Sequence, residues 1–209
     1  MAGGFATVEP LDPDRHAAEL FDANSEDREV AAWTYYNFGP FTTLPEYRAW
    51  LDAGCANPDR YYHAIRDNAQ GKAVGVVVYQ NCVPTMGTIE IGGLVFSPRL
   101  QRRPAATEAM FLMMRRVFDK LGYSRYEWKC DLLNLPSRAA AVRLGFRYEG
   151  LLRQAMITRG RNRDTAWSSV IDRDRPPLRA AFERWLDPGN FAVDGSQRRR
   201  LADLRCDAG

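Results

Sequence analysis

A short basic turn, Gln101-Arg102-Arg103, is followed directly by Pro104 and by apolar residues at helical spacing. Proline suits the first turn of a helix because its missing N–H would have no partner there. The free N–H groups and the dipole of a helix N-terminus attract anions, and the two arginines add formal positive charge. The turn therefore predicts a site for a phosphate or another anion at residues 101–107. A solvated turn with two surface arginines would explain the same residues.

One acidic residue, Glu90, interrupts the apolar run at 89–96 that leads into this turn. The run is short and rich in β-branched residues, which is typical of a buried strand. A carboxylate inside such a strand either lies on the polar face of the sheet or belongs to a substrate site, where it could act as a general base.

Asn134 and Ser137 stand at the start of a short helical pattern at 135–144. A serine hydroxyl held beside a reacting group could donate a proton to it. Asparagine is also common in turns, and serine is common in the first turn of a helix. These residues alone leave both interpretations open.

The elements that must position these side chains follow from hydrophobic periodicity and from Gly and Pro breaks. The strand at 89–96, a helix from Pro104 to Gly122 and a strand at 126–131 form a βαβ unit. The chain as a whole predicts an α/β fold, with a mixed, mostly antiparallel sheet of about seven strands flanked by helices on both faces. Strands are expected at 5–9, 61–66, 73–83, 89–96, 126–131, 146–156 and 164–171, and helices at 17–21, 25–33, 43–55, 104–121, 135–144 and 176–186.

Composition limits the function classes. The 209 residues are 45% hydrophobic and 11% aromatic, as in a globular protein. The net charge of +3 is too small for a nucleic-acid binder, and the run Arg198–Arg200 is more typical of a solvated face. Four scattered cysteines and two isolated histidines predict no metal site and indicate a reducing compartment. No apolar run is long enough for a membrane span, so we expect a cytoplasmic protein without nucleic-acid or membrane partners.

Three motifs in order resemble the GNAT superfamily of N-acetyltransferases, most closely its RimJ/RimL-like branch. The turn Gln101–Ala106 is similar to the family's pyrophosphate loop, Q/R-x-x-G-x-G/A, and continues as Ala-Thr-Glu-Ala at 106–109. Asn134-Leu135-Pro136-Ser137 and the later Leu-Gly-Phe and Glu-Gly pairs at 144–150 resemble N-x-x-S…LGF-x-x-EG. The resemblance covers residues 5–172 and is most specific at 88–150. In one departure, Pro104 stands where the family usually has glycine, and proline cannot donate an N–H to the pyrophosphate.

The resemblance implies a single GNAT-like domain at 1–186, a polar C-terminal tail at 187–209, and acetyl-CoA as co-substrate without a metal. The tail is expected to be flexible or to pack on a second subunit, and a homodimer fits the family. Catalytic roles are expected for Ser137 as proton donor, for Glu90 as base and for Asn134. The residues expected to bind acetyl-CoA are Val95, Phe96, Ser97, Gln101, Arg102, Arg103, Ala105, Ala106, Thr107, Asn134, Ser137 and Arg138.

An aromatic segment at 33–41 is expected to cover the acceptor side, although such residues could equally close the end of the core. The residues expected to bind the acceptor are Trp33, Tyr35, Tyr36, Phe38 and Glu127. The resulting prediction is direct acetyl transfer, in a ternary complex, to a primary amine of a protein N-terminus, an amino acid or a small molecule. A non-catalytic CoA-binding sensor or scaffold protein is the alternative, because Pro104 and the uncertain base would suit a chain without turnover.

Overall fold

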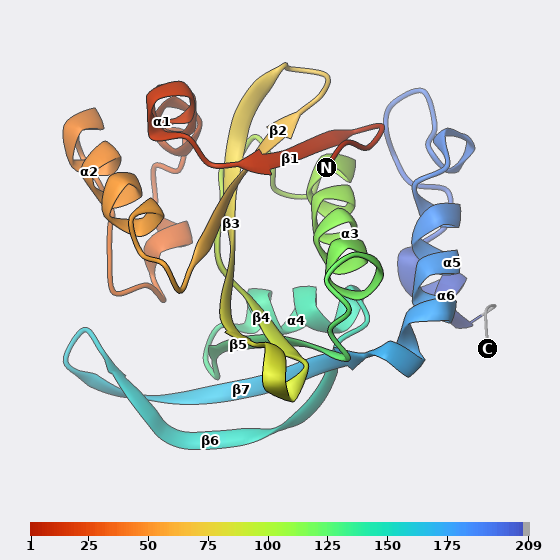
Figure 1. The fold of residues 1–209 in the computed structure, drawn as a ribbon. Helices are drawn as coiled ribbons and strands as arrows, with labels where there is room; N and C mark the ends of the chain where they lie inside the picture. The colour runs from red at the N-terminus through yellow and green to blue at the C-terminus, as the bar shows by residue number, and fades with distance from the viewer. Residues whose placement is uncertain (207–209) are drawn as a thin grey trace.

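The computed structural model describes residues 1–206 and contains one seven-stranded sheet (Figure 1). The strands are β1 (Ala6–Pro10), β2 (Tyr61–Asp67), β3 (Lys72–Val83), β4 (Thr88–Phe96), β5 (Arg125–Asp131), β6 (Arg147–Thr158) and β7 (Arg161–Ile171). They lie in the order β1-β2-β3-β4-β5-β7-β6, and every neighbouring pair is antiparallel except β4 and β5. The predicted mixed, mostly antiparallel sheet is confirmed.

Helices cover both faces of this sheet. They are α1 (Pro13–Asn24), α2 (Leu44–Cys55), α3 (Pro104–Asp119), α4 (Leu135–Arg143), α5 (Arg175–Trp185) and α6 (Leu201–Cys206). In Figure 1, α1 and α2 lie on one side of the sheet, and α3, α5 and α6 lie on the other. Successive side chains of β3 point to opposite faces of the sheet and so contribute to two hydrophobic cores. Val76 and Val78 pack with α1 and α2, whereas Val77 and Tyr79 pack with α3.

β4 and β5 part after four residue pairs, which run from Thr88 opposite Arg125 to Ile91 opposite Trp128. Beyond that point a bulge disrupts the β3–β4 register, and Gly93 adopts a φ of +56°. A Cβ at Gly93 would lie 2.7 Å from the Val78 side chain, so a larger residue would have neither the backbone freedom nor the space. The bulge turns β4 away from β5 and opens the sheet.

The predicted helix at 25–33 is wrong. Ser25 ends α1 as its C-cap, and residues 25–30 form turns before a single 3-10 turn at Ala31–Trp33. The Asp27 carboxylate accepts hydrogen bonds from the Ala31 and Ala32 N–H groups, at 3.2 and 2.9 Å, which holds this turn apart from α1. Trp33 is then drawn into an aromatic cluster with Phe41, Tyr47 and Trp50.

The described part of the C-terminal segment, residues 187–206, is folded against α5. Leu201 and Leu204 of α6 are buried in the same core cluster as Phe182 and Trp185 of α5. The Asn190 side chain joins the two parts, because it donates to the Trp185 carbonyl at 3.0 Å and accepts from the Arg199 N–H at 3.0 Å. The few apolar residues of this arginine-rich segment therefore anchor it to α5.

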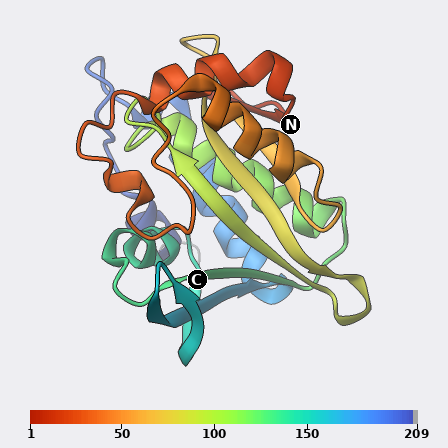
Figure 2. The same cartoon turned by 90° about the vertical axis from the view of Figure 1, so that its left-hand side faces the viewer.

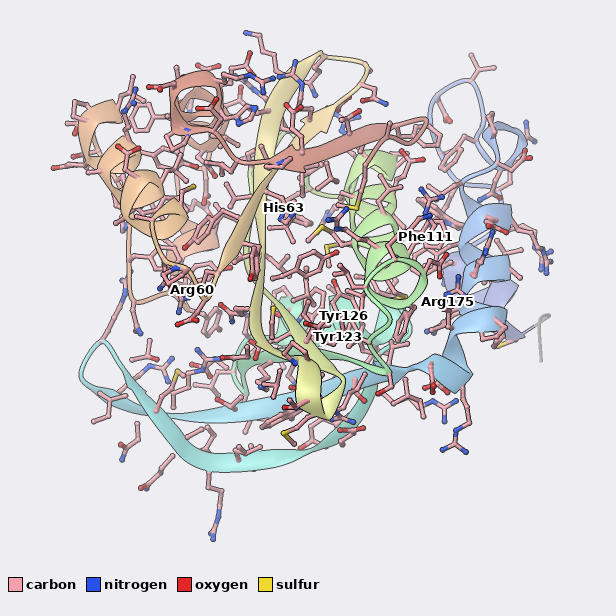
Figure 3. The ribbon with its side chains drawn as sticks, in the orientation of Figure 1. Arg60, His63, Phe111, Tyr123, Tyr126 and Arg175 are labelled. Atoms are coloured by element: carbon pink, nitrogen blue, oxygen red, sulfur yellow. The ribbon has the colours of Figure 1, made fainter. Side chains whose placement is uncertain are left out.

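His63 makes the stability of the fold depend on pH. Figure 3 shows its ring between the sheet and α3, and burial lowers its pKa from 6.5 to about 4. The unfolded chain takes up this proton below pH 6.5, so the stabilisation is complete above pH 6.5 and is lost as the pH falls toward 4. The difference in the His63 pKa between the unfolded and folded states corresponds to about 3 kcal/mol of unfolding free energy.

Urea unfolding of the wild type and of His63→Phe between pH 7 and pH 4 would test this dependence. We expect the wild type to lose about 3 kcal/mol more than the variant over this range, because His16 and all carboxyl groups are common to both proteins. Parallel pH profiles for the two proteins would contradict the prediction.

Candidate active site

A cleft of about 1680 Å³ passes through the sheet where β4 and β5 part. On one face it is lined by the first turn of α3 and by α4, including Thr107 and Ser137. On the other face it is lined by the segment between α1 and α2, including Tyr36, and by β7. The opening in the sheet therefore connects two half-sites.

The basic turn forms one end of the cleft. Arg102 and Arg103 are exposed, line the cleft and form no side-chain hydrogen bond or ion pair with another described residue. Arg102 has a φ of +59°, which is unusual for a residue with a side chain, and the N–H groups of Arg102 and Ala105 meet no acceptor within residues 1–206. Two unpaired guanidinium groups and two free N–H groups at the start of α3 make an anion-binding concavity. The residues fit a diphosphate although Pro104 donates no N–H.

Arg143 adds a third cation to this end of the cleft. It extends from α4, donates to the Thr107 hydroxyl at 3.0 Å, and its guanidinium lies 5.1 Å from the centre of the Trp185 ring. Burial, together with nearby Arg205, lowers the pKa of the Arg143 guanidinium. Phe191 and Gln197 of the C-terminal segment line the same wall, and Gln197 accepts from the Trp185 indole at 2.9 Å.

Ser137 lies in the middle of the cleft. The Asn134 side chain caps α4 by accepting from the Ser137 N–H at 3.1 Å, which fixes the first turn of the helix. The Ser137 hydroxyl oxygen accepts from the Trp128 indole of β5 at 3.0 Å, so its own proton is available to a group in the cleft. Burial raises the pKa of the neighbouring Cys130 thiol, and a hydrogen bond with Ser137 opposes that shift. The arrangement holds one hydroxyl donor at the parting of the strands.

Glu90 lines the cleft and already accepts from three donors. It is 3% exposed, and its two oxygens accept from the side chains of Gln80 at 2.7 Å, Asn81 at 2.8 Å and Lys129 at 2.8 Å. A direct proton transfer to Glu90 would compete with these three donors for the carboxylate.

The segment between α1 and α2 forms a roof over the acceptor side. Figure 2 shows it descending toward the β6–β7 hairpin. The Tyr36 hydroxyl donates to the Leu94 carbonyl of β4 at 2.8 Å, and the Tyr35 hydroxyl donates to the Leu133 carbonyl at 2.9 Å. From the hairpin turn, Arg159 donates to the carbonyls of Tyr36 and Gly39, both at 2.8 Å. These bonds tie the roof to both sides of the cleft.

The structure brings most of the predicted site residues into the cleft. Those lining it are Tyr35, Tyr36, Phe38, Glu90, Phe96, Gln101, Arg102, Arg103, Ala106, Thr107, Asn134 and Ser137. Those whose side chains lie outside it are Trp33, Val95, Ser97, Ala105, Glu127 and Arg138.

The six outside residues serve the surrounding structure. Val95 and Ala105 are buried in the core, and Trp33 is at the centre of the aromatic cluster. Both the Ser97 hydroxyl and its N–H donate to the Val74 carbonyl. Glu127 pairs with Arg125 at 2.7 Å and Lys129 at 3.1 Å, and Arg138 donates to the Leu132 carbonyl at 3.3 Å. Pantetheine pairing by the Ser97 N–H would require this existing bond to break.

Sequence reasoning missed Arg143, Arg159 and Arg163, which all contact or line the cleft. Arg143 is an ordinary polar position of the predicted helix, and its partner Thr107 is 36 residues away. Arg159 and Arg163 fall in the predicted hairpin turn, whereas β7 begins at Arg161 and places Arg163 on the strand. The apolar residues Phe191, Leu201 and Leu204 are the sequence signal that could have shown that the C-terminal segment packs against the domain.

Residues 1–206 contain no helix with the length and apolarity that a bilayer crossing needs. Over the same part of the chain, no three His, Cys, Asp or Glu side chains gather as a metal-binding group would require.

The sequence profile of the Acetyltransferase (GNAT) domain matches residues 6–147, and the chain belongs to this family. With the fold and cleft described above, this makes the protein an acyltransferase of the GNAT superfamily, whose fold uses acetyl-CoA. No curated protein matches the chain.

Solved structures agree with this assignment. A GCN5-related N-acetyltransferase from Brucella melitensis is 44% identical with a TM-score of 0.96, and the match covers 98% of this chain and 93% of that one. A probable acetyltransferase of the GNAT family from Chromobacterium violaceum is 40% identical with a TM-score of 0.76, covering 82% and 85% of the two chains. Mycobacterium smegmatis RimJ in complex with CoA-disulfide, at 21% identity and a TM-score of 0.66 over 83% and 85%, shares the fold.

Proposed function

We propose that this protein is an N-acetyltransferase that moves the acetyl group of acetyl-CoA directly to a primary amine in a ternary complex. The observation that carries the proposal is the cleft through the sheet, with unpaired arginines at one end and the Ser137 hydroxyl where β4 and β5 part. The donor would enter from the α3–α4 face and the amine from the face covered by α1 and α2. Such an arrangement lets the two substrates meet without a covalent enzyme intermediate.

Each group of cleft residues has a separate role in this proposal. Acetyl-CoA, when bound, supplies the acetyl thioester. Arg102 and Arg103 bind its diphosphate, and Arg143 and Trp185 bind the adenosine end. The Ser137 hydroxyl donates a proton to the departing sulfur, which leaves more readily as a thiol than as a thiolate. Asn134 positions Ser137 through the cap of α4.

The amine must lose a proton before it can attack. We infer that Glu90 and Lys129 take part through water rather than by direct contact, because both Glu90 oxygens are already occupied by donors. The charged pair would then fix the water that receives the proton.

We propose that the protein belongs to the RimJ/RimL-like branch of the GNAT superfamily. The motifs at Asn134–Ser137 and at 144–150 support this proposal. That branch suggests a protein N-terminus as the acceptor, and amino acids and small amines share the required chemistry. We further propose one catalytic domain at 1–186 with the 187–206 segment as its cofactor-side wall. Four free cysteines favour a cytoplasmic location.

Thermal melting with acetyl-CoA tests the cofactor half of the proposal. A ligand that binds only the folded protein, present at a hundredfold excess over its Kd, stabilises it by about 2.7 kcal/mol. Removing the two charge-assisted contacts in Arg102→Ala/Arg103→Ala should weaken binding at least about tenfold. The control is Arg28→Ala/Arg153→Ala, which removes the same charge from exposed sites away from the cleft and should melt like wild type with ligand.

A thiol-release assay with a panel of amines tests the transfer half. Turnover with at least one amine is expected. A melting shift without any turnover would support the CoA-binding sensor instead. No melting shift at millimolar acetyl-CoA would mean that Pro104 has disabled the loop, and the proposal would fail.

A further inference from the structure

Three polar atoms on one face of β7 are buried without a hydrogen-bond partner in the described chain: Arg163 Nε, Thr165 Oγ1 and Trp167 Nε1. Residues two apart on a strand point to the same side, and all three residues line the cleft. Thr165 is only 5% exposed. Because a buried polar group without a partner is costly, three of them on one wall indicate that a ligand satisfies them.

Arg163 also adds a positive charge to this wall. The neighbouring acidic groups already have partners: Glu90 pairs with Lys129 at 2.8 Å and Asp131 pairs with Arg161 at 2.5 Å. Within residues 1–206, Arg163 forms no ion pair. Arg163 and the Trp167 indole are obligate donors, and the Thr165 hydroxyl can donate. The wall therefore suits a ligand group that is negative and accepts several hydrogen bonds.

This wall lies on the acceptor side of the opening. Thr165 stands opposite Asp131 of β5 and Trp167 stands opposite Lys129, whereas Cys130 between them points to the other face, beside Ser137. Lys129 Nζ lies 3.8 Å from the centre of the Trp167 ring and holds the indole against β5. Arg163 is close enough to act electrostatically on both Tyr36 of the roof and Cys130. A group bound here would be next to the proton donor but outside the cofactor half-site.

We propose that Arg163, Thr165 and Trp167 form a carboxylate subsite, and that the acceptor is a small amine carrying a carboxylate, such as a free amino acid. A guanidinium and two further donors match the lone pairs of a carboxylate. The roof, bonded to Leu94, Leu133 and the β6–β7 turn, covers the acceptor side, which favours a small molecule over a protein chain. This inference rests on the proposed acetyltransferase function and narrows its acceptor.

Thiol release by the full chain with acetyl-CoA tests the subsite. Each standard amino acid would be compared with its C-terminal amide, its decarboxylated amine and an amidated tetrapeptide that begins with the same residue. For the best side chain, we expect kcat/KM for the free acid to exceed that for the amide at least about tenfold. Arg163→Gln should reduce this acid-to-amide ratio to about one, and Arg163→Lys should retain part of it.

Thr165→Val, which replaces the hydroxyl by a methyl group, should lower the same ratio about threefold or more. Arg153→Gln, an exposed arginine on the adjacent β6, is the matched control and should leave the ratio unchanged. A wild-type ratio near one, or a preference for amides or tetrapeptides, would overturn the carboxylate subsite and leave the N-acetyltransferase intact. Absence of turnover in every arm would overturn the proposed function itself, and the subsite with it.

Discussion

Ser137→Ala is expected to lower kcat by a factor of about 10²–10³, which corresponds to roughly 3–4 kcal/mol of transition-state stabilisation. In the proposed mechanism this hydroxyl protonates the departing sulfur. Its oxygen is anchored by the Trp128 indole at 3.0 Å and its backbone by Asn134 at 3.1 Å. Alanine keeps the helix but has no proton to give. The KM for acetyl-CoA should change by less than about threefold, because a proton donor to the departing sulfur would stabilise the transition state more than the bound ground state.

Comparing two acetyl thioesters with different leaving groups would distinguish the loss of a proton donor from a general disturbance of the site. An acetyl thioester of a more acidic thiol needs less protonation, so the loss caused by Ser137→Ala should shrink with it. Ser124→Ala is the control, because Ser124 lies outside the cleft and its hydroxyl makes one hydrogen bond, to the Gly87 carbonyl at 3.3 Å. Melting temperatures would show whether the unpaired Trp128 indole weakens the fold. If kcat of the Ser137 variant stayed within about threefold of wild type for both thioesters, Ser137 would not be the proton donor.

The cofactor half of the cleft could be predicted because its signals are local. The strand at 89–96, the helix start at Pro104 and the short helix after Asn134 each depend on a few adjacent residues, and the structure reproduces all three. Local signals also failed once. Ser25 with acidic residues after it predicts a helix start, but Asp27 uses its carboxylate to cap the next turn and Trp33 joins distant aromatic residues.

The acceptor half depends on contacts between distant segments, which carry no local pattern. Arg159 donates to carbonyls more than 100 positions earlier in the chain. The Glu90 partners come from two places in the sequence, the adjacent Gln80 and Asn81 and the distant Lys129. Strand alternation predicts a polar side for Glu90, but not that Lys129 neutralises it. Arg163 lines the cleft because β7 begins at Arg161, whereas the sequence predicts that this strand begins at residue 164.

Glu108→Ala is expected to lower the free energy of unfolding by about 3–4 kcal/mol, although Glu108 belongs to the segment that resembles the family's cofactor loop. Its carboxylate is 6% exposed and accepts from the N–H groups of Gly4 at 2.9 Å, Phe5 at 2.6 Å and Ala6 at 2.6 Å. A Cβ at Gly3 would lie 2.3 Å from the carboxylate carbon, so the chain approaches closely here. Removing the carboxylate leaves three donors without a partner at the junction of β1 and α3.

Guanidinium unfolding would measure this loss. Glu108→Gln keeps one acceptor oxygen and should cost roughly half as much, and Glu183→Ala, which removes an exposed pair with Arg179, should cost less than about 0.5 kcal/mol. Loss of less than about 1 kcal/mol in Glu108→Ala would mean that water replaces the carboxylate. Arg102 and Arg103 directly precede α3 and line the cleft. Releasing the N-terminal strand from α3 should therefore also weaken acetyl-CoA binding, even though Glu108 itself does not line the cleft.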